Sequence, residues 1–282
     1  MSEDRSILVR QDPADRNGGT ASPAQVPVAV AGTGLVSLLI PCCGGLEYTR
    51  LCVPSVLRHS RPPFELLFLD IGSLDGTAEY LAGIAAAAPV RVEVIRAATD
   101  LDIGRACAEA LRRARGEFLV LLNNDTLVPP GWLQQLTALA SMSFGVGLAG
   151  PMSNYAAEPQ RVETVPYRVG PRKGTRPMGG PDPGLVDVEA VTAFARQFRE
   201  DHKGKWMEAE RLGGFCLLLK REVPSRIGPL EGEAGLGLFD TDLLSVKVRQ
   251  AGYTLAVCRD LFVHHFGTRI FAHGARPAAT GG

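Results

Sequence analysis

Residues 117–125 read EFLVLLNND, so that five consecutive apolar residues are followed directly by two amides and a carboxylate. A short apolar run that ends in turn-forming residues is typical of a strand buried on both faces of a sheet. Three runs of the same form come earlier in the chain: LVSLLIP at 35–41, FELLFLD at 64–70 and VRVEVIR at 90–96. The first half of the chain is therefore predicted to contain four buried strands.

Segments with helical spacing of apolar residues separate these strands, at 46–59, 76–88 and 103–115. An alternation of strands and helices favours a parallel sheet with right-handed crossovers. A fourth helix is predicted at 131–141 and a small fifth strand at 146–149. The first half is thus predicted to be an α/β unit.

The character of the sequence changes after Gly150. Residues 151–187 are rich in Pro and Gly, which predicts a long mobile loop of the kind that often closes over a site. Further elements are predicted at 188–203 (helix), in LGGFCLLLKREV at 212–223 (strand), at 242–250 (helix) and at 253–263 (strand). We divide the chain into a flexible leader (1–34), a first half (35–150), a second half (151–266) that includes the loop, and a tail (267–282).

The composition is that of an ordinary soluble globular protein, with 45% hydrophobic and 21% charged residues. The 30 basic side chains balance the 30 acidic ones, which argues against nucleic acid as a partner, and we interpret Arg112, Arg113 and Arg115 as a solvated helix face. No apolar stretch approaches the roughly 20 residues that cross a bilayer, so we expect a cytoplasmic protein, with peripheral docking at the inner face of the membrane left open. The six cysteines are expected to be reduced and mostly buried.

Polar residues follow the predicted strands at their carboxyl ends, where open parallel sheets bind their ligands. The four ends read Pro41-Cys42-Cys43-Gly44, Asp70-Ile71-Gly72-Ser73, Asp100-Leu101-Asp102 and Asn123-Asn124-Asp125. Three of the four carry carboxylates, which suits a sugar, a ribose or a metal better than a bare phosphate.

Asp125, with Asn123 and Asn124 before it, has the donor atoms to bind a hard divalent cation if a diphosphate supplies further oxygens. The same residues are also suited to a plain turn that caps the next helix. His264 and His265 follow the apolar run LFV, and adjacent strand residues face opposite ways, so only one of the two can enter a site. A neutral imidazole there would complete the coordination of a metal held by Asp125, although a histidine pair also serves purely structural roles.

Asp240 and Asp242 stand just ahead of the helix predicted at 242–250. Transfer of a group onto a hydroxyl needs a nearby carboxylate that takes the proton, and either residue offers one. Alternatively, Asp242 or Thr241 caps a helix that starts at Leu243. Asp75, at the start of the second helix, is interpreted as structural because the helix dipole favours an acidic residue there.

Taken in order, these motifs resemble those of the family 2 glycosyltransferases with a GT-A fold. The matching pieces, from about Leu35 to Phe271, are VSLLIP, PPFELLFLDIGSLDGTAEYL, ARGEFLVLLNNDTLVPPGWL, GPMSNY, GGFCLLLKREV, GLGLFDTDLL, AGYTLAV and FVHHFGTR. The resemblance implies an α/β protein whose mostly parallel, Rossmann-like central sheet is flanked by helices. It also implies that residues 35–150 bind a nucleotide sugar and that the smaller half, 151–266, binds an acceptor.

The resemblance further implies a site and a reaction, namely transfer of a sugar from a UDP-, GDP- or dTDP-sugar to a hydroxyl, usually with inversion at the anomeric carbon. The acceptor class stays open among a glycan, a lipid carrier, a peptide and a small molecule. Mn²⁺ or Mg²⁺ would be held by Asp125 with one of His264 and His265, and Asp240 or Asp242 would be the base. The donor would lie across the strand ends, at Pro41, Cys43, Asp70, Asp102, Asn123, Asn124 and Asp125.

The chain departs from the family pattern at several of these positions, namely Cys43, Gly44, Ile71, Asp102, Ala108 and Phe239. Ile71 cannot hydrogen-bond a nucleobase, so Asp70, Asp102 or backbone groups would have to do so. The departures leave a second hypothesis open, that a glycosyltransferase-like domain has lost turnover and acts as a binding or assembly module. An unrelated doubly wound nucleotide-binding protein is disfavoured, because no glycine-rich phosphate-binding motif follows the first strand.

Overall fold

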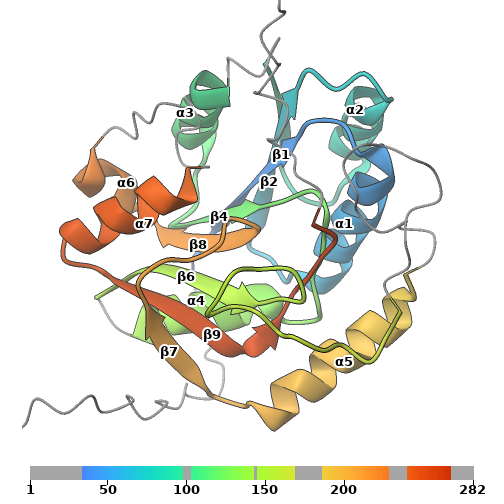
Figure 1. Cartoon of the computed structure of the whole chain (residues 1–282). Coiled ribbons are helices and arrows are strands. Elements are labelled where there is room, and N and C mark those ends of the chain that lie inside the picture. Colours follow the sequence, from blue (N-terminus) through green and yellow to red (C-terminus); the bar gives the residue numbers. More distant parts are fainter. Residues whose placement is uncertain (1–33, 98–102, 143–144, 169–185, 229–239, 268–282) are drawn as a thin grey trace, which may run out of the picture.

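The computed structural model describes residues 34–97, 103–142, 145–168, 186–228 and 240–267. Within them, eight strands form one sheet in the order β3-β2-β1-β4-β8-β6-β9-β7, and two short strands, β5 and β10, form a second (Figure 1). The strands are β1 (Val36–Cys42), β2 (Phe64–Ile71), β3 (Val92–Ala97), β4 (Phe118–Leu122), β5 (Thr126–Leu127), β6 (Val146–Met152), β7 (Trp206–Ala209), β8 (Cys216–Lys220), β9 (Thr254–Phe262) and β10 (His264–His265). The helices are α1 (Leu46–His59), α2 (Thr77–Ala87), α3 (Ile103–Arg113), α4 (Trp132–Met142), α5 (Val188–Asp201), α6 (Glu222–Ile227) and α7 (Thr241–Gln250).

The four strands predicted in the first half are confirmed, and they pair in parallel. β1 lies between β2 and β4, with Leu39 opposite both Leu67 and Leu121. Every residue of β1, β2 and β4 is buried, as expected for strands covered by helices on both faces. Because these strands run the same way, their carboxyl ends meet at one edge of the sheet.

Alternating side chains of each strand enter two separate cores. Leu38 and Ile40 of β1 pack in a cluster with residues of α1, α2 and α4, whereas Leu39 packs in a cluster with residues of α3, α5 and α7. Trp132 of α4 is fully buried in the first cluster and donates from Nε1 to Ser60 Oγ, 3.0 Å away. The sheet is therefore the middle of three layers.

The second half of the chain extends this sheet with mixed pairing. β8 is antiparallel to both β4 and β6, β6 is parallel to β9, and β7 is antiparallel to β9. Pro151 and Met152, which the sequence placed in the loop 151–187, belong instead to β6, because β6 continues along β9 as far as Phe262.

Several expectations about individual segments fall outside the described residues. These are the leader up to residue 33, the loop segment 169–185, the strand end at 98–102 with Asp102, and the tail from 268. Among the residues that the structure does describe, no helix combines the length and the apolarity that a bilayer span requires.

The cysteines are as the sequence led us to expect. None of the six forms a disulfide, and all except Cys43 are buried. Burial raises the pKa of Cys52 to about 12, so this thiol stays protonated.

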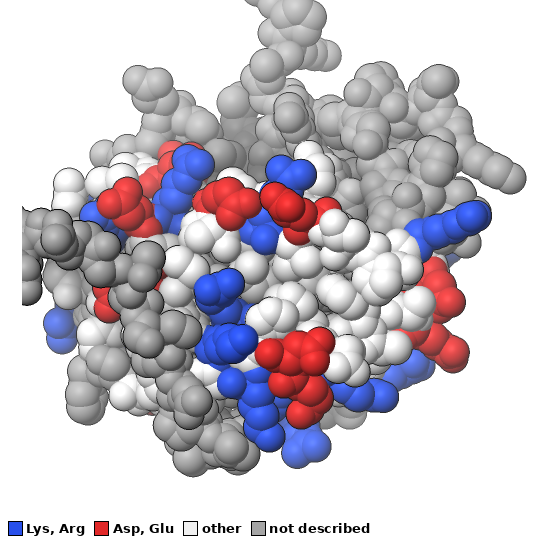
Figure 2. Space-filling model, turned by 60° about the horizontal axis from the view of Figure 1, so that its bottom comes forward, with Lys and Arg blue, Asp and Glu red and all other residues white. Residues whose placement is uncertain are grey.

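The charged surface is mixed in sign. Figure 2 shows basic and acidic side chains interspersed on one face of the molecule. Arg112 and Arg113 are exposed and both pair with Glu109, and Arg113 also pairs with Glu93. Arg112 and Arg113 thus form a solvated helix face, as the sequence predicted, and they are also ion-paired, whereas Arg115 lies beyond the end of α3.

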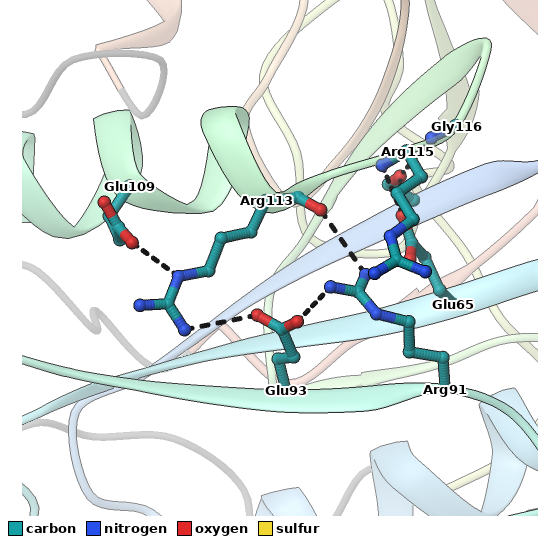
Figure 3. Close-up of polar contacts among 8 residues, drawn as sticks. Glu65, Arg91, Glu93, Glu109, Arg113, Arg115 and Gly116 are labelled. Carbon is teal, nitrogen blue, oxygen red and sulfur yellow. Dashed lines mark hydrogen bonds and ion pairs between the residues drawn. The ribbon is translucent and has the colours of Figure 1, made fainter.

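A buried carboxylate joins the first strands at the edge of the sheet opposite their carboxyl ends. Glu65 of β2 is 2% exposed and accepts hydrogen bonds from Ser37 Oγ at 2.5 Å and from the backbone N–H of Arg115 at 2.6 Å. It also pairs with Arg91, which in turn pairs with Glu93 (Figure 3). Although burial disfavours the charged form, these donors together hold the pKa of Glu65 below its ordinary value.

We expect Glu65→Gln to lower the free energy of unfolding at neutral pH by about 2 kcal/mol, because the buried donors lose a charged acceptor. A carboxyl whose pKa is lower in the folded state stabilises the fold above its unfolded pKa, about 4.3, and loses this contribution as the pH falls. The difference between wild type and Glu65→Gln should therefore shrink below that pH. Urea unfolding at pH 7 and at acidic pH measures it, and Glu93→Gln, which removes a half-exposed carboxylate, should cost less than about 1 kcal/mol.

Candidate functional site

The small sheet of β5 and β10 brings the end of β4 to the histidine pair. Thr126 pairs with His265 and Leu127 with His264, in antiparallel register. Phe266 N–H also donates to the carbonyl of Asp125, 3.0 Å away. As a result, Asp125, which is 1% exposed, lies with Oδ1 3.3 Å from His265 Nε2.

Hydrogen bonding fixes which nitrogen of His265 faces Asp125. His265 Nδ1 lies 2.8 Å from the carbonyl oxygen of Tyr155, and a carbonyl only accepts, so Nδ1 carries a proton. In the neutral ring, Nε2 then presents a lone pair to Oδ1 of Asp125, which also carries lone pairs. The contact is favourable only if a cation lies between the two atoms or if a proton binds to Nε2. Burial opposes charging of His265, but the field of Asp125 outweighs it and raises the pKa of the imidazole.

His264 faces the other way, as adjacent strand residues must. Its Nδ1 lies 2.8 Å from the hydroxyl of Tyr167, and its ring packs edge-on against those of Tyr167 and Phe266. Burial lowers the pKa of His264 to about 3, so the ring is neutral. Of the two histidines, the structure therefore places His265 in contact with Asp125 and packs His264 among aromatic rings.

The two amides before Asp125 have different surroundings. Asn124 is 2% exposed, and its Nδ2 donates to the carbonyl of Gly44 at 3.1 Å and to Thr49 Oγ1 at 2.8 Å. These bonds hold the end of β1 against the end of β4, which is a scaffolding arrangement. Asn123 is half-buried, with its backbone N–H bonded to the carbonyl of Phe215.

The ends of β1 and β2 are joined by Ser73. Its hydroxyl donates to the carbonyl of Cys42 at 3.3 Å and accepts from Gly44 N–H at 2.9 Å. Asp70, 2% exposed, accepts from Ser73 N–H and from Arg96 Nε, both at 3.2 Å. Pro41 is buried and Cys43 is half-buried beside this junction, whereas Ile71 packs in the core at 1% exposure.

Asp75 plays the structural part that the sequence predicted. Oδ2 accepts from Leu46 N–H at 2.9 Å, and Oδ1 accepts from Thr77 N–H at 3.2 Å and from Thr77 Oγ1 at 2.6 Å. One carboxylate thereby satisfies the first turns of both α1 and α2.

The cap of α7 differs from the sequence-based alternatives. The helix begins at Thr241, and Asp240 is its N-cap, with Oδ1 accepting from Leu243 N–H at 3.1 Å. The expectation of Asp242 or Thr241 as the cap was wrong, because the helix begins earlier than Leu243 and places Asp242 in its first turn, where it is exposed.

The segment just before β8 contacts both the start of α7 and His265. A Cβ added to Gly214 would stand 2.8 Å from Thr241 Cγ2, so the two residues are in contact. The next residue, Phe215, stacks on the imidazole of His265 with ring centroids 5.3 Å apart and an interplanar angle of 17°. The candidate base and the candidate metal ligand are thus joined by one short run of chain.

Three residues beside His265 were not singled out from the sequence, namely Asn154, Tyr155 and Phe215. Asn154 and Tyr155 directly follow β6, so the rule that polar residues at strand ends mark a site would have found Asn154. The carbonyl of Tyr155 and the ring of Phe215 carry no sequence signal, since they act through backbone position and packing.

The side chains at this site suit a divalent cation that a bound substrate also helps to coordinate. Within the described ranges, no group of three or more His, Cys, Asp and Glu side chains is placed to bind a metal. Asp125 and His265 supply one oxygen and one nitrogen donor, and cations of the Mg²⁺ and Mn²⁺ kind are commonly bound by one or two carboxylates together with the phosphates of a substrate. The residues present therefore fit a two-donor site that is completed by a diphosphate.

Residues 37–162 match the family described as Glycosyl transferase family 2. The chain is 31% identical over 226 residues to the uncharacterized protein y4gI of Sinorhizobium fredii (strain NBRC 101917 / NGR234), covering 79% of this chain and 23% of that protein. It is 26% identical over 126 residues to the putative glycosyltransferase EpsH of Bacillus subtilis (strain 168), covering 45% and 35%. The chain thus spans only about a quarter to a third of the length of these relatives.

Solved structures share the fold. The mannosyltransferase PcManGT from Pyrobaculum calidifontis, in complex with GDP-Man and Mn²⁺, matches with a TM-score of 0.57 at 19% identity, over 89% of this chain and 61% of that one. GalNAc-T7 with UDP, GalNAc and Mn²⁺ matches with a TM-score of 0.61 at 17% identity, over 88% and 46%. Residues 1–349 of TarS from S. aureus, in complex with UDP-GlcNAc, match with a TM-score of 0.54 at 13% identity, over 86% and 61%.

Proposed function

We propose that this chain, which has the GT-A fold and matches glycosyl transferase family 2 over residues 37–162, is a member of that family and transfers a sugar from a nucleoside-diphosphate sugar to a hydroxyl acceptor. The single observation that carries the proposal is the buried contact of Asp125 with His265 at the end of β4. The two structural neighbours named with Mn²⁺ also contain GDP-Man or UDP, which supports a donor of this class.

In this proposal Asp125 and His265 hold Mn²⁺ or Mg²⁺ against the diphosphate of the donor. The mixture of an oxygen and a nitrogen donor favours Mn²⁺ of the two. When bound, the cation offsets the negative charge that builds up on the departing nucleoside diphosphate. Asp125 would act on the diphosphate only through this cation, since two anions repel each other, and the Tyr155 carbonyl keeps Nε2 of His265 on the side of the ring that faces Asp125.

We assign the binding of the nucleoside part of the donor to the neighbouring strand ends. Asp70, oriented by Ser73 and Arg96, lies where the nucleoside would bind, beside Pro41 and Cys43. Asn123 and Asn124 shape the turn between this region and Asp125, and Asp102 belongs to the same proposed set from outside the described residues.

Asp240 is the proposed general base. Its Oδ1 is held by the first turn of α7, so we assign Oδ2 to take the proton of the acceptor hydroxyl as that oxygen attacks the sugar. A base on the side opposite the leaving diphosphate implies a single displacement with inversion at the anomeric carbon. Asp242, exposed on the same turn, is the second candidate for this role.

We also propose that the two halves of the chain share the reaction. Residues 35–150, with Asp70 and Asp125, bind the donor, and residues 151–266, with Asp240, bind the acceptor. His265 comes from the second half but contacts Asp125 of the first, so the metal site would lie at their junction.

Calorimetric titration with UDP, GDP and dTDP, each with and without Mn²⁺, tests the proposal without knowledge of the acceptor. We expect one nucleotide to bind only when Mn²⁺ is present, and the matching sugar nucleotide to be hydrolysed slowly. Metal-dependent binding without hydrolysis or transfer would favour the binding module over the enzyme. Absence of binding to every nucleotide, with and without metal, would overturn the proposed function.

His265→Ala is expected to weaken Mn²⁺-dependent nucleotide binding on the order of 100-fold, since removal of a direct ligand should cost at least as much as changes beyond the ligand shell. The same titration measures it. His202→Ala, the same change to a histidine at the end of α5, serves as the matched control and should leave the affinity unchanged. If His265→Ala binds nucleotide and Mn²⁺ with wild-type affinity, His265 is not a ligand of the metal.

A further inference from the structure

The side chain of Asn154 makes two hydrogen bonds to the main chain of His265. Its Oδ1 accepts from the N–H of His265 at 3.0 Å, and its Nδ2 donates to the carbonyl of His265, also at 3.0 Å. One side chain therefore satisfies both backbone groups of a single residue, as a neighbouring strand would. Of the short side chains, only a carboxamide offers a donor and an acceptor side by side, so this geometry selects Asn.

The backbone around Asn154 is itself fixed. Ser153 N–H donates to the carbonyl of Gln160 at 2.8 Å, and Val162 N–H donates to the carbonyl of Ser153 at 2.8 Å. The side chain of Gln160, 1% exposed, donates to the carbonyl of Pro151 at 2.8 Å and accepts from Gly213 N–H at 2.6 Å. The segment that carries Asn154 is thus tied both to β6 and to the residues just before Phe215.

The same segment also sets the ring of His265. The carbonyl of Tyr155, the residue next to Asn154, accepts from Nδ1, while Phe215 stacks on the face of the imidazole. Backbone and ring are therefore held together by neighbouring residues, and the outcome is the 3.3 Å approach of Nε2 to Asp125 Oδ1.

We infer that Asn154 is a positioning residue, whose paired hydrogen bonds to the His265 backbone hold the imidazole Nε2 in place beside Asp125. This inference deepens the proposed function and rests on it for the identity of the cation. It assigns to the residues after β6 an indirect part in building the metal site, because they fix the position of His265 relative to Asp125.

Two variants test the inference. Asn154→Asp keeps the size and the acceptor for His265 N–H, but it sets a second acceptor against the carbonyl of His265. Asn154→Leu keeps much of the volume and removes both bonds. Gln197→Glu, the same amide-to-acid change on the exposed face of α5, is the control.

The first measurement is the affinity for Mn²⁺ alone, followed by the electron paramagnetic resonance signal of the unbound ion. We expect both Asn154 variants to bind Mn²⁺ between 10- and 100-fold more weakly than the wild type, the usual size of an effect exerted through a metal ligand. Gln197→Glu should match the wild type. Thermal unfolding of all four proteins shows whether a loss of affinity accompanies a loss of the fold.

The second measurement needs no metal. In ¹⁵N-histidine spectra of the metal-free protein, recorded at a pH high enough for the imidazole of His265 to be neutral, His265 should show a proton held on Nδ1, and the Asn154 variants should lose this fixed tautomer while remaining folded. Wild-type spectra and wild-type Mn²⁺ affinity in both variants would overturn the inference. If the wild type binds Mn²⁺ neither alone nor together with UDP, GDP or dTDP, but the variants change the spectrum of His265, the proposed metal site fails while the positioning by Asn154 stands.

Discussion

Asp125→Asn is expected to reduce the hydrolysis of the matching sugar nucleotide by about 10³-fold, and with it all Mn²⁺-dependent nucleotide binding. The substitution keeps the shape of the side chain but replaces a charged oxygen donor with a neutral one. Loss of the cation removes several kcal/mol of stabilisation from the charge that develops on the leaving diphosphate, and about 4 kcal/mol corresponds to the stated factor.

Asp201→Asn, the same chemical change at the exposed end of α5, is the control for Asp125→Asn. Steady-state release of nucleoside diphosphate measures the rate, and calorimetry at fixed Mn²⁺ measures the binding. Asp125 is buried beside His265, so thermal unfolding must accompany both measurements. If Asp125→Asn is folded and keeps Mn²⁺-dependent turnover, the assignment of Asp125 as the metal ligand is wrong.

Asp240→Asn is expected to reduce sugar transfer by between about 10² and 10⁴, the usual contribution of a general base, while nucleotide binding stays at the wild-type level. The substitution is informative because Asn caps helices as well as Asp does. The bond from Leu243 N–H to the side-chain oxygen, and with it the start of α7, should therefore survive. A loss of rate then reports the loss of a proton acceptor and not of the helix.

Asp242→Asn decides between the two carboxylates of this turn. Once an acceptor is known, initial rates of transfer for the two variants identify the base as the residue with the larger loss. If Asp240→Asn transfers sugar at the wild-type rate and Asp242→Asn does not, the assignment of Asp240 is wrong. The anomeric configuration of the product, read by proton NMR, tests the proposed inversion in the same reaction mixtures.

Much of the fold was accessible from local sequence patterns. The mostly apolar runs that contain Val36–Cys42, Phe64–Ile71 and Phe118–Leu122 became central parallel strands, because runs with few polar side chains fit a position that is buried on both faces. The family followed from the order of the short motifs and is matched over residues 37–162. The mixed pairing of the second half was not predicted, since strand order depends on long-range packing that a local pattern does not encode.

The candidate site was predictable in its residue types and not in its geometry. Asp125 was singled out because it follows a buried strand, and the histidine pair because it follows the last one. Nothing local indicates that β5 and β10 pair with each other, yet this pairing is what brings His265 to Asp125. The roles of both residues stay predictions until the variants are measured.

The sequence by itself determined the layered α/β architecture, the resemblance to a family, and the set of polar residues at the strand ends, because apolar periodicity and strand-end chemistry are local properties. Only the tertiary structure decided that His265 and not His264 contacts Asp125, that Asn124 braces the end of β1, and that Asp240 caps α7. These outcomes depend on which backbone groups lie within hydrogen-bonding distance of each side chain, and residues far apart in the chain supply those groups only after the sheet has assembled.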